Sequence, residues 1–158
     1  MPAGKSADPM SAARRSPARN SRPRRHPGRG DPRRALGRRG EQLAADHLRR
    51  LGFSALRRNE RTRYGEIDLI AFDGLTLVFA EVKTLRLAPG SGHDSRYLQP
   101  LHRLGPRQRA RLRRLAVAWL SSETEVRPTA RTIRFDAIGV TVDRHHELVR
   151  IEHIEGAW

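Results

Sequence analysis

Two runs of apolar residues flank the dipeptide Asp73-Gly74 near the middle of the chain. Asp-Gly between two apolar runs is the strongest short-range signal for a β-hairpin with a two-residue turn. A turn of this length pairs Phe72 with Leu75. The pattern therefore predicts a hairpin that the rest of the chain is organised around.

The expected pairing gathers charged side chains at the end of the hairpin away from the turn. Counting outward from the turn places Asp68 opposite Phe79 and Glu66 opposite Glu81. Paired residues point to the same side of a sheet, and alternate residues along a strand share a face. Four charged side chains are therefore expected on one face: Glu66, Asp68, Glu81 and Lys83.

Both faces of the expected hairpin are otherwise apolar, which is typical of strands covered on both sides. One face carries Ile70, Phe72, Leu75, Leu77 and Phe79, and the other carries Ile67, Leu69, Ala71, Val78, Ala80 and Val82. Clustered carboxylates in such a place cost several kcal/mol unless a cation or hydrogen bonds compensate them. A divalent metal ion is the favoured explanation, and exposed charges at a strand end are the alternative.

The remaining apolar positions predict two helices and three further strands. Helical spacing indicates helices at about 36–51, ended by Gly52, and 107–121, whereas short apolar runs indicate strands at 53–59, 132–142 and 146–154. Residues 86–105 show no clear period and are expected to form a long loop. This order predicts an α/β three-layer sandwich with a central mixed sheet and flanking helices.

Glu41 is a further acidic candidate on the first expected helix. At 100° per residue it lies about 20° from Leu48, at the edge of the apolar face. This carboxylate is therefore expected to border whatever the helix packs on. His47 shares the face, and a satisfied or partly exposed histidine is favoured there over a metal ligand.

The positive charge of the chain is concentrated at its N-terminus. Residues 1–39 hold 12 of the 32 Lys and Arg but only two of the 17 acids, together with six of the ten prolines. Residues 1–35 are therefore expected to be a disordered basic arm ahead of a domain at 36–158. A solvated tail, a start at Met10, nonspecific phosphate binding and an organellar transit peptide are the alternatives for this arm.

Lysine usage singles out one residue of the expected hairpin. The chain contains only two lysines, Lys5 in the arm and Lys83, whereas its other 30 basic residues are arginine. A lysine amine is compact and its pKa shifts readily, unlike that of arginine. Lys83 is therefore predicted to position or deprotonate an attacking water, with a structural ion pair to Glu81 as the alternative.

Arginines near the acidic cluster suit contacts with phosphate groups, because a carboxylate site must still attract a polyanion. Arg61 and Arg63 precede the hairpin, and the second expected helix carries arginines without acids at i,i+4 spacing, including Arg107 and Arg111. Nucleic acid, most simply DNA, is the expected partner. The chain has no cysteine, no stretch long enough to span a membrane and no signal-peptide core, which together favour a cytoplasmic protein with no membrane partner.

Several short motifs resemble the bacterial UPF0102 (YraN) family. They are Gly40-Glu41, Asn59-x-Arg61-x-Arg63-x-Gly65-Glu66-Ile67-Asp68-Leu69-Ile70-Ala71, Phe79-Ala80-Glu81-Val82-Lys83, Arg134-Phe135-Asp136 and His153-Ile154-x-x-Ala157-Trp158. The resemblance covers about residues 36–158. It implies the restriction-endonuclease-like fold of the PD-(D/E)xK nucleases and a similarity to archaeal Holliday junction resolvases, which act as homodimers.

By position, the resemblance implies that Asp68 and Glu81 are the metal-binding acids and Lys83 is the lysine of the E-x-K element. Glu41 corresponds to the helix-borne acid that resolvase-like members add. A hard cation, Mg²⁺ or Mn²⁺, suits such an all-carboxylate site. The expected activity is a metal-dependent endonuclease acting on DNA, including branched or damaged DNA, and the alternative is a non-catalytic nucleic-acid-binding protein with the same fold.

Two positions differ from the residues usual in that family. Leu85 stands where members usually have arginine, with Arg86 one place later, and Gln108 stands where they often have lysine. Arg86 is therefore included among the expected nucleic-acid contacts. Asp136 is expected to be a structural acid bonded to Arg134 or to the backbone.

Overall fold

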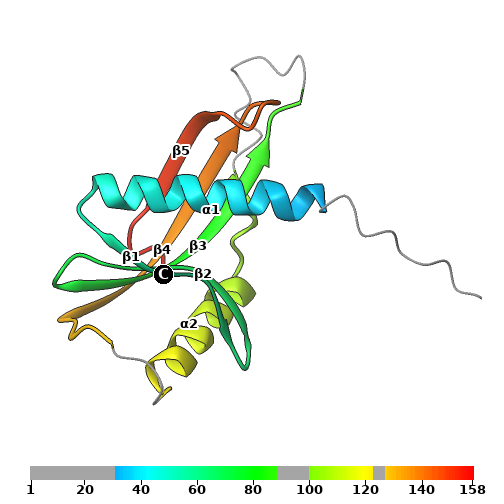
Figure 1. Ribbon diagram of the computed structural model, residues 1–158. Coiled ribbons are helices and arrows are strands. Elements are labelled where there is room, and N and C mark those ends of the chain that lie inside the picture. The colour runs from blue at the N-terminus through cyan, green and yellow to red at the C-terminus, as the bar shows by residue number, and fades with distance from the viewer. Residues whose placement is uncertain (1–30, 89–99, 123–126) are drawn as a thin grey trace, which may run out of the picture.

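The computed structural model describes residues 31–88, 100–122 and 127–158 (Figure 1). Its elements run in the order α1 (Pro32–Arg50), β1 (Ser54–Thr62), β2 (Gly65–Phe72), β3 (Thr76–Arg86), a short 3-10 helix η1 (Pro100–Arg103), α2 (Pro106–Leu120), β4 (Thr132–Val142) and β5 (Leu148–Ile154). None of the helices in these ranges is long and apolar enough to cross a membrane.

The strands form one mixed sheet in the order β1-β2-β3-β4-β5. Only β3 and β4 are parallel, and the chain joins them through η1 and α2; the other neighbours are antiparallel. Helix α1 lies across one face of the sheet and α2 packs on the other. The three-layer α/β sandwich predicted from the sequence is confirmed.

Two separate apolar cores hold the layers together. The core under α1 contains Leu48 of the helix with Leu69 and Val78 of the sheet. The core under α2 contains Leu115 of the helix with Phe79. Since both faces of the central strands are buried, the expectation from their continuous apolar pattern is confirmed.

Helix α1 begins four residues earlier than the predicted start at residue 36, so residues 32–35 do not belong to the predicted arm. Asp31 is the N-cap and its carboxylate accepts a hydrogen bond from the Arg33 N–H at 3.0 Å. Pro32 occupies the first helical turn, where its fixed φ fits and no N–H is needed. The expected arm at residues 1–30, and His93 and Asp94 of the expected loop, lie outside the described residues.

The β2–β3 turn differs from the predicted two-residue turn. The observed pairs include Phe72 with Leu77 and Leu69 with Ala80, so the loop has four residues, 73–76. The Asp73 carboxylate accepts hydrogen bonds from the backbone N–H groups of residues 75 and 76, at 2.8 and 2.6 Å, and these bonds stabilise the longer loop. Each strand residue therefore faces a partner two places later than predicted, and Leu75 is exposed in the loop. A shift by two residues does not by itself change the face on which a side chain lies.

The alternation along β2 breaks at Asp68. Ile67 was predicted to share a face with Leu69, but it packs in the core under α2, whereas Leu69 packs under α1. On the neighbouring strand Asn59, which lies between the residues paired with Ile67 and Leu69, has a left-handed backbone with φ 52°. The break in alternation on β2 thus lies opposite an irregular residue of β1.

The other boundaries agree closely with the sequence pattern. The second helix and the strand 132–142 are confirmed within one residue. Strand β1 continues to Thr62, beyond the predicted end near residue 59, and β5 begins at Leu148. Gly52 follows α1 with φ 94°, a conformation that favours glycine, and the predicted helix end is confirmed.

Helix α1 approaches β3 closely at Gly40, the residue before Glu41. A Cβ atom at Gly40 would lie 1.7 Å from Oγ1 and 2.8 Å from Cβ of Thr84. Only glycine permits this contact, and the contact brings Glu41 toward the central strands. Gly37 lies about one turn earlier in the helix. A Cβ atom there would have space around it, since the nearest atom, Oε1 of Glu41, would be 3.9 Å away.

We expect Gly40→Ala to lower the free energy of unfolding by about 1–3 kcal/mol, because the methyl group forces α1 away from Thr84. Gly37→Ala is the matched control and should raise stability by about 0.5–1 kcal/mol through helix propensity. Urea denaturation of both variants measures the two effects. Equal effects of the two substitutions would contradict the close helix–strand contact.

Candidate active site

Asp68 of β2 and Glu81 of β3 come together where the two strands stop pairing. The last backbone pair of this ladder is Leu69 with Ala80. Beyond it, Oδ2 of Asp68 accepts a hydrogen bond from the Val82 N–H at 2.8 Å and takes the place of a backbone acceptor. Glu81 is buried, with 5% of its surface exposed.

Two cations of the chain compensate the Glu81 carboxylate. The Lys83 ammonium lies 2.5 Å from its Oε1, and the Arg111 guanidinium of α2 lies 3.8 Å from its Oε2. Arg111 also donates a hydrogen bond to the backbone carbonyl of Glu66 at 3.1 Å. The ion pair weighed for Lys83 from the sequence is thus present, and it holds the amine beside the acidic pair.

Asn59 connects Glu41 to this cluster. Its amide nitrogen donates a hydrogen bond to Oε2 of Glu41 at 2.6 Å. In the β1–β2 register Asn59 lies opposite Asp68, between the pairs Arg58–Leu69 and Glu60–Ile67. Sequence reasoning assigned Asn59 no role, although asparagine is among the few residues that adopt a left-handed backbone readily.

A groove of about 440 Å³ opens beside Glu41, and we call it the α1 groove. It is lined by Arg34, Gly37, Arg38, Glu41, Asn59, Arg61 and Glu66. Arg34 and Arg38 were not among the predicted contacts. Their spacing of four places them on one helix face with Glu41, which is the signal that could have found them.

The environment of the cluster shifts the pKa of the Asp68 carboxyl. Burial raises the pKa of its carboxyl to about 7, with repulsion from Glu81 and Glu41 adding to the rise. The Val82 N–H and the charge of Lys83 oppose this change in pKa. Asp68 therefore binds a proton near neutral pH unless a further cation stabilises its charge.

The donor set fits a hard divalent cation held by two carboxylates. Within the described residues, no group of three or more His, Asp or Glu side chains is arranged to enclose a metal ion. Mg²⁺ is commonly bound through only one or two carboxylates, together with water and substrate phosphate. Asp68 and Glu81 would hold such an ion, and Glu41 lies close enough to affect the charge of Asp68.

The five predicted nucleic-acid contacts lie at different distances from the cluster. Arg61 lines the α1 groove and Arg111 contacts Glu81. The Arg63 guanidinium lies over the Tyr64 ring, 4.7 Å from its centroid, at the end of the β1–β2 hairpin. Arg86 ends β3 and Arg107 lies in the first turn of α2, both exposed. The structure thus brings two of the five arginines close to the acidic residues.

Gln108, the second position that differs from the usual family residue, caps α2. Its side-chain oxygen accepts a hydrogen bond from the Gly105 N–H at 3.1 Å.

Asp136 belongs to a separate buried hydrogen-bond network. The sequence predicts that it is a structural acid bonded to Arg134 or to the backbone, and the structure shows both contacts. It accepts hydrogen bonds from Arg134, from the Gly156 N–H at 3.0 Å and from Nε2 of His153 at 2.9 Å. Although burial alone would raise the pKa of the Asp136 carboxyl, these bonds hold it below its ordinary value. His153 also shares a hydrogen bond of 3.2 Å with His47 of α1, so the network ties that helix to β4 and β5.

Comparison with known proteins identifies the family of this chain. The sequence model of the uncharacterised protein family UPF0102 matches residues 40–140, which include all three acids of the cluster and Lys83. The chain belongs to UPF0102. The resemblance seen in the motifs is therefore confirmed at the level of this family.

Relatives in UPF0102 match most of this chain and nearly all of their own length. A UPF0102 protein of Acidothermus cellulolyticus is 46% identical over 133 residues, covering 80% of this chain and 95% of that protein. One of a Parafrankia species is 47% identical over 124 residues, covering 78% and 95%. One of Geobacter sulfurreducens is 41% identical over 123 residues, covering 78% and 88%.

The raised pKa of Asp68 predicts how stability depends on pH in the absence of metal. Its carboxyl titrates near 3.8 when unfolded and near 7 when folded. Between these values the folded state binds more protons, so the free energy of unfolding falls as pH rises toward 7. Asp68→Asn has no carboxyl at this position, so its free energy of unfolding should not fall in this way. In EDTA at pH 8 the variant should be more stable than the wild type by up to about 4 kcal/mol.

Denaturation of wild type and variant between pH 4 and 8 measures this difference, which should shrink toward the acid end. Asp46→Asn, a partly exposed carboxylate on α1, is the control for the loss of one negative charge. If Asp68→Asn is no more stable than the wild type at pH 8, the pKa of Asp68 is not raised in the folded protein.

Proposed function

We propose that this protein is a metal-dependent endonuclease that acts on DNA, with Asp68 and Glu81 as the ligands of Mg²⁺ or Mn²⁺. The observation that supports this most is the convergence of the buried Glu81 and the half-buried Asp68 with the only lysine of residues 6–158. When bound, the cation supplies positive charge beside the phosphoryl group and makes water easier to deprotonate. The similarity to PD-(D/E)xK nucleases noted in the motifs agrees with this proposal.

The residues of the chain have separate roles in this proposal. Asp68 and Glu81 provide negative charge for the cation, and Glu41 is held nearby by Asn59. The Lys83 side chain is 34% exposed, so its ammonium faces both Glu81 and the solvent. From this position it donates a hydrogen bond to the attacking water or to a phosphate oxygen. Arg111 balances the charge of Glu81 from the other side.

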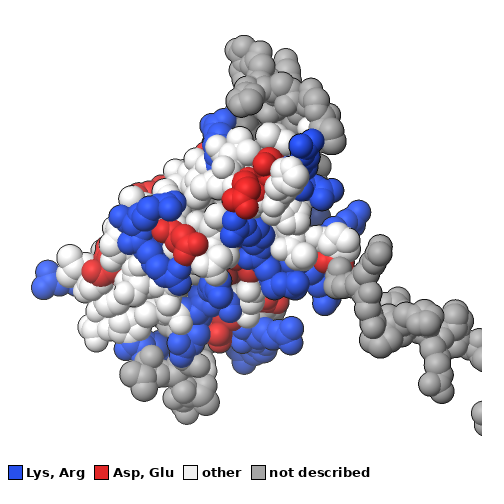
Figure 2. Space-filling model, turned by 45° about the horizontal axis from the view of Figure 1, so that its top comes forward, with Lys and Arg blue, Asp and Glu red and all other residues white. Residues whose placement is uncertain are grey.

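Arginines around the cluster provide the attraction for a polyanion. Arg34, Arg38 and Arg61 line the same groove as Glu41. Figure 2 shows Lys and Arg side chains spread over the viewed face, with acidic side chains between them. The net charge of +15 raises the association rate with DNA and makes the affinity fall with salt.

The direct test is cleavage of supercoiled plasmid and of a four-way DNA junction in the presence of Mn²⁺. Asp68→Asn and Lys83→Ala should abolish cleavage, because each removes a group that acts on the phosphate or the cation. Asn59→Gly keeps the left-handed backbone but loses the contact with Glu41, and should lower the rate by about 10–100-fold. Asp46→Asn, outside the cluster, should cleave like the wild type.

Circular dichroism of each variant checks that folding survives. Equal cleavage by purified wild type and Asp68→Asn would show that the activity belongs to a contaminant. The proposal that this site cleaves DNA would then be contradicted.

A second candidate is a nucleic-acid-binding protein that has the same fold and no catalysis. It is supported by one observation: Lys83 and Arg111 of the chain itself form ion pairs with Glu81. This function predicts salt-sensitive DNA binding, no cleavage of any of the substrates and no effect of Asp68→Asn on DNA affinity beyond the loss of one charge.

A further inference from the structure

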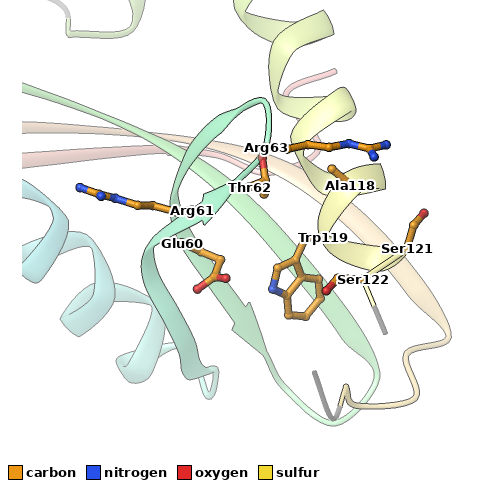
Figure 3. A pocket seen from close by; sticks show the side chains of 8 residues that line it. All are labelled: Glu60, Arg61, Thr62, Arg63, Ala118, Trp119, Ser121 and Ser122. Carbon is orange, nitrogen blue, oxygen red and sulfur yellow. The ribbon is translucent and has the colours of Figure 1, made fainter. Parts of the chain in front are cut away.

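A second pocket, of about 350 Å³, lies between the end of β1 and the C-terminal end of α2 (Figure 3). We call it the α2 pocket, and its volume is within the range of small-molecule sites. It is lined by Glu60, Arg61, Thr62, Arg63, Ala118, Trp119, Ser121 and Ser122. Arg61 also lines the α1 groove, so the two hollows adjoin along β1.

The lining of the α2 pocket includes a buried donor without a partner and a half-buried carboxylate. Trp119 is only 4% exposed, and its buried Nε1–H has no hydrogen-bond partner. Glu60 is half-buried, and within the described ranges its carboxylate makes no hydrogen bond or ion pair. In Figure 3 the nitrogen-bearing edge of the indole faces Glu60. The buried Trp119 N–H costs about 1–3 kcal/mol while it has no partner, and a ligand that accepts a hydrogen bond from it would recover this free energy.

The rest of Trp119 is enclosed by the protein. Its ring makes a T-shaped contact with Phe79, with centroids 5.6 Å apart, and the Arg127 guanidinium lies 5.5 Å from its centroid. The ring is therefore part of the core and offers no stacking face as large as those of open single-strand platforms. The polar groups that the pocket offers a ligand include the Trp119 N–H and the Glu60 carboxylate.

We propose that the α2 pocket binds one unpaired guanine base of a nucleic acid. The N1–H and 2-amino groups of guanine are adjacent donors that match the two oxygens of Glu60, and O6 accepts from the Trp119 N–H. Adenine and cytosine offer one amino donor beside a ring acceptor that the carboxylate repels. The N3–H of thymine or uracil lies between two carbonyls, which the carboxylate also repels.

The flanking arginines favour a nucleotide within a strand over a free base. Arg63 lies beside the pocket, where it would contact a phosphate next to the bound base, whereas the Arg61 side chain extends away from Trp119 (Figure 3) into the α1 groove, where it would contact the strand further along. Arg111 lies two turns before Trp119 on α2, about 12 Å along the helix axis. A strand with its base in the α2 pocket would thus pass close to Glu81 and Lys83. This inference rests on the proposed function for its substrate class, and it specifies DNA with an unpaired base.

The test compares a labelled duplex that carries one extra, unpaired guanine with a fully paired duplex, by fluorescence anisotropy in EDTA. Wild type should bind the bulged duplex about tenfold tighter or more, since a bidentate base contact contributes about 1–3 kcal/mol of discrimination. Glu60→Gln should reduce this ratio to near one. Glu152→Gln, which removes a carboxylate from β5, should keep the ratio, because it changes only the nonspecific affinity.

Duplexes with an unpaired adenine, cytosine or thymine complete the experiment. Equal affinity for all four bulges, or for bulged and paired duplexes, would overturn the proposal, as would an undiminished ratio in Glu60→Gln. Asp68→Asn should keep the preference for guanine in EDTA. A preference for the guanine bulge in EDTA, with no cleavage of plasmid or junction in Mn²⁺, would therefore reject the nuclease function alone, whereas cleavage in Mn²⁺ without this preference would reject the base pocket alone.

Discussion

The partial burial of the Asp68 carboxylate beside the buried Glu81 carboxylate is the constraint that the rest of the site depends on. Burial and the neighbouring charge raise the pKa of the Asp68 carboxyl to about 7. A position that only needed to fold would be better filled by an apolar residue, since replacing buried ionic groups by apolar ones is often neutral or stabilising. The cluster is thus a local cost to stability that a bound cation would offset, as is common where a site is built for function.

The fold meets this constraint with single residues from several elements. The end of the β2–β3 ladder exposes the Val82 N–H to Asp68, and α2 brings Arg111 to Glu81. Gly40 lets α1 lie against Thr84, and Asn59 then holds the neighbouring Glu41. None of these contacts is large, but each fixes one charge relative to the next. The same irregular stretch of β1 and β2 carries the α1 groove on one side and the α2 pocket on the other.

The periodic parts of the fold could be predicted from the sequence, because burial on both faces leaves continuous apolar runs and helical spacing. The acidic cluster could be predicted as well, since a loop of two or four residues leaves Asp68 and Glu81 on the same face. The register itself could not, because the Asp73 carboxylate binds the backbone of its own loop. The face of Ile67 breaks the alternation of its own strand, opposite the left-handed backbone of Asn59 on the next strand, and the apolar pattern does not indicate this break. Pairs such as Glu60 and Trp119 meet only through the packing of α2 on the sheet, which no local pattern encodes.

Calorimetric titration of Mn²⁺ into the metal-free protein tests most directly whether this cluster is a cation site. The experiment is performed at pH 7 in two buffers with different ionisation enthalpies, on wild type and Asp68→Asn. Because metal ligands must be deprotonated and the pKa of Asp68 is about 7, binding to the wild type should release about half a proton. Asp68→Asn should bind far more weakly and without this release. Equal affinity of the two proteins, with no proton released by either, would contradict the account.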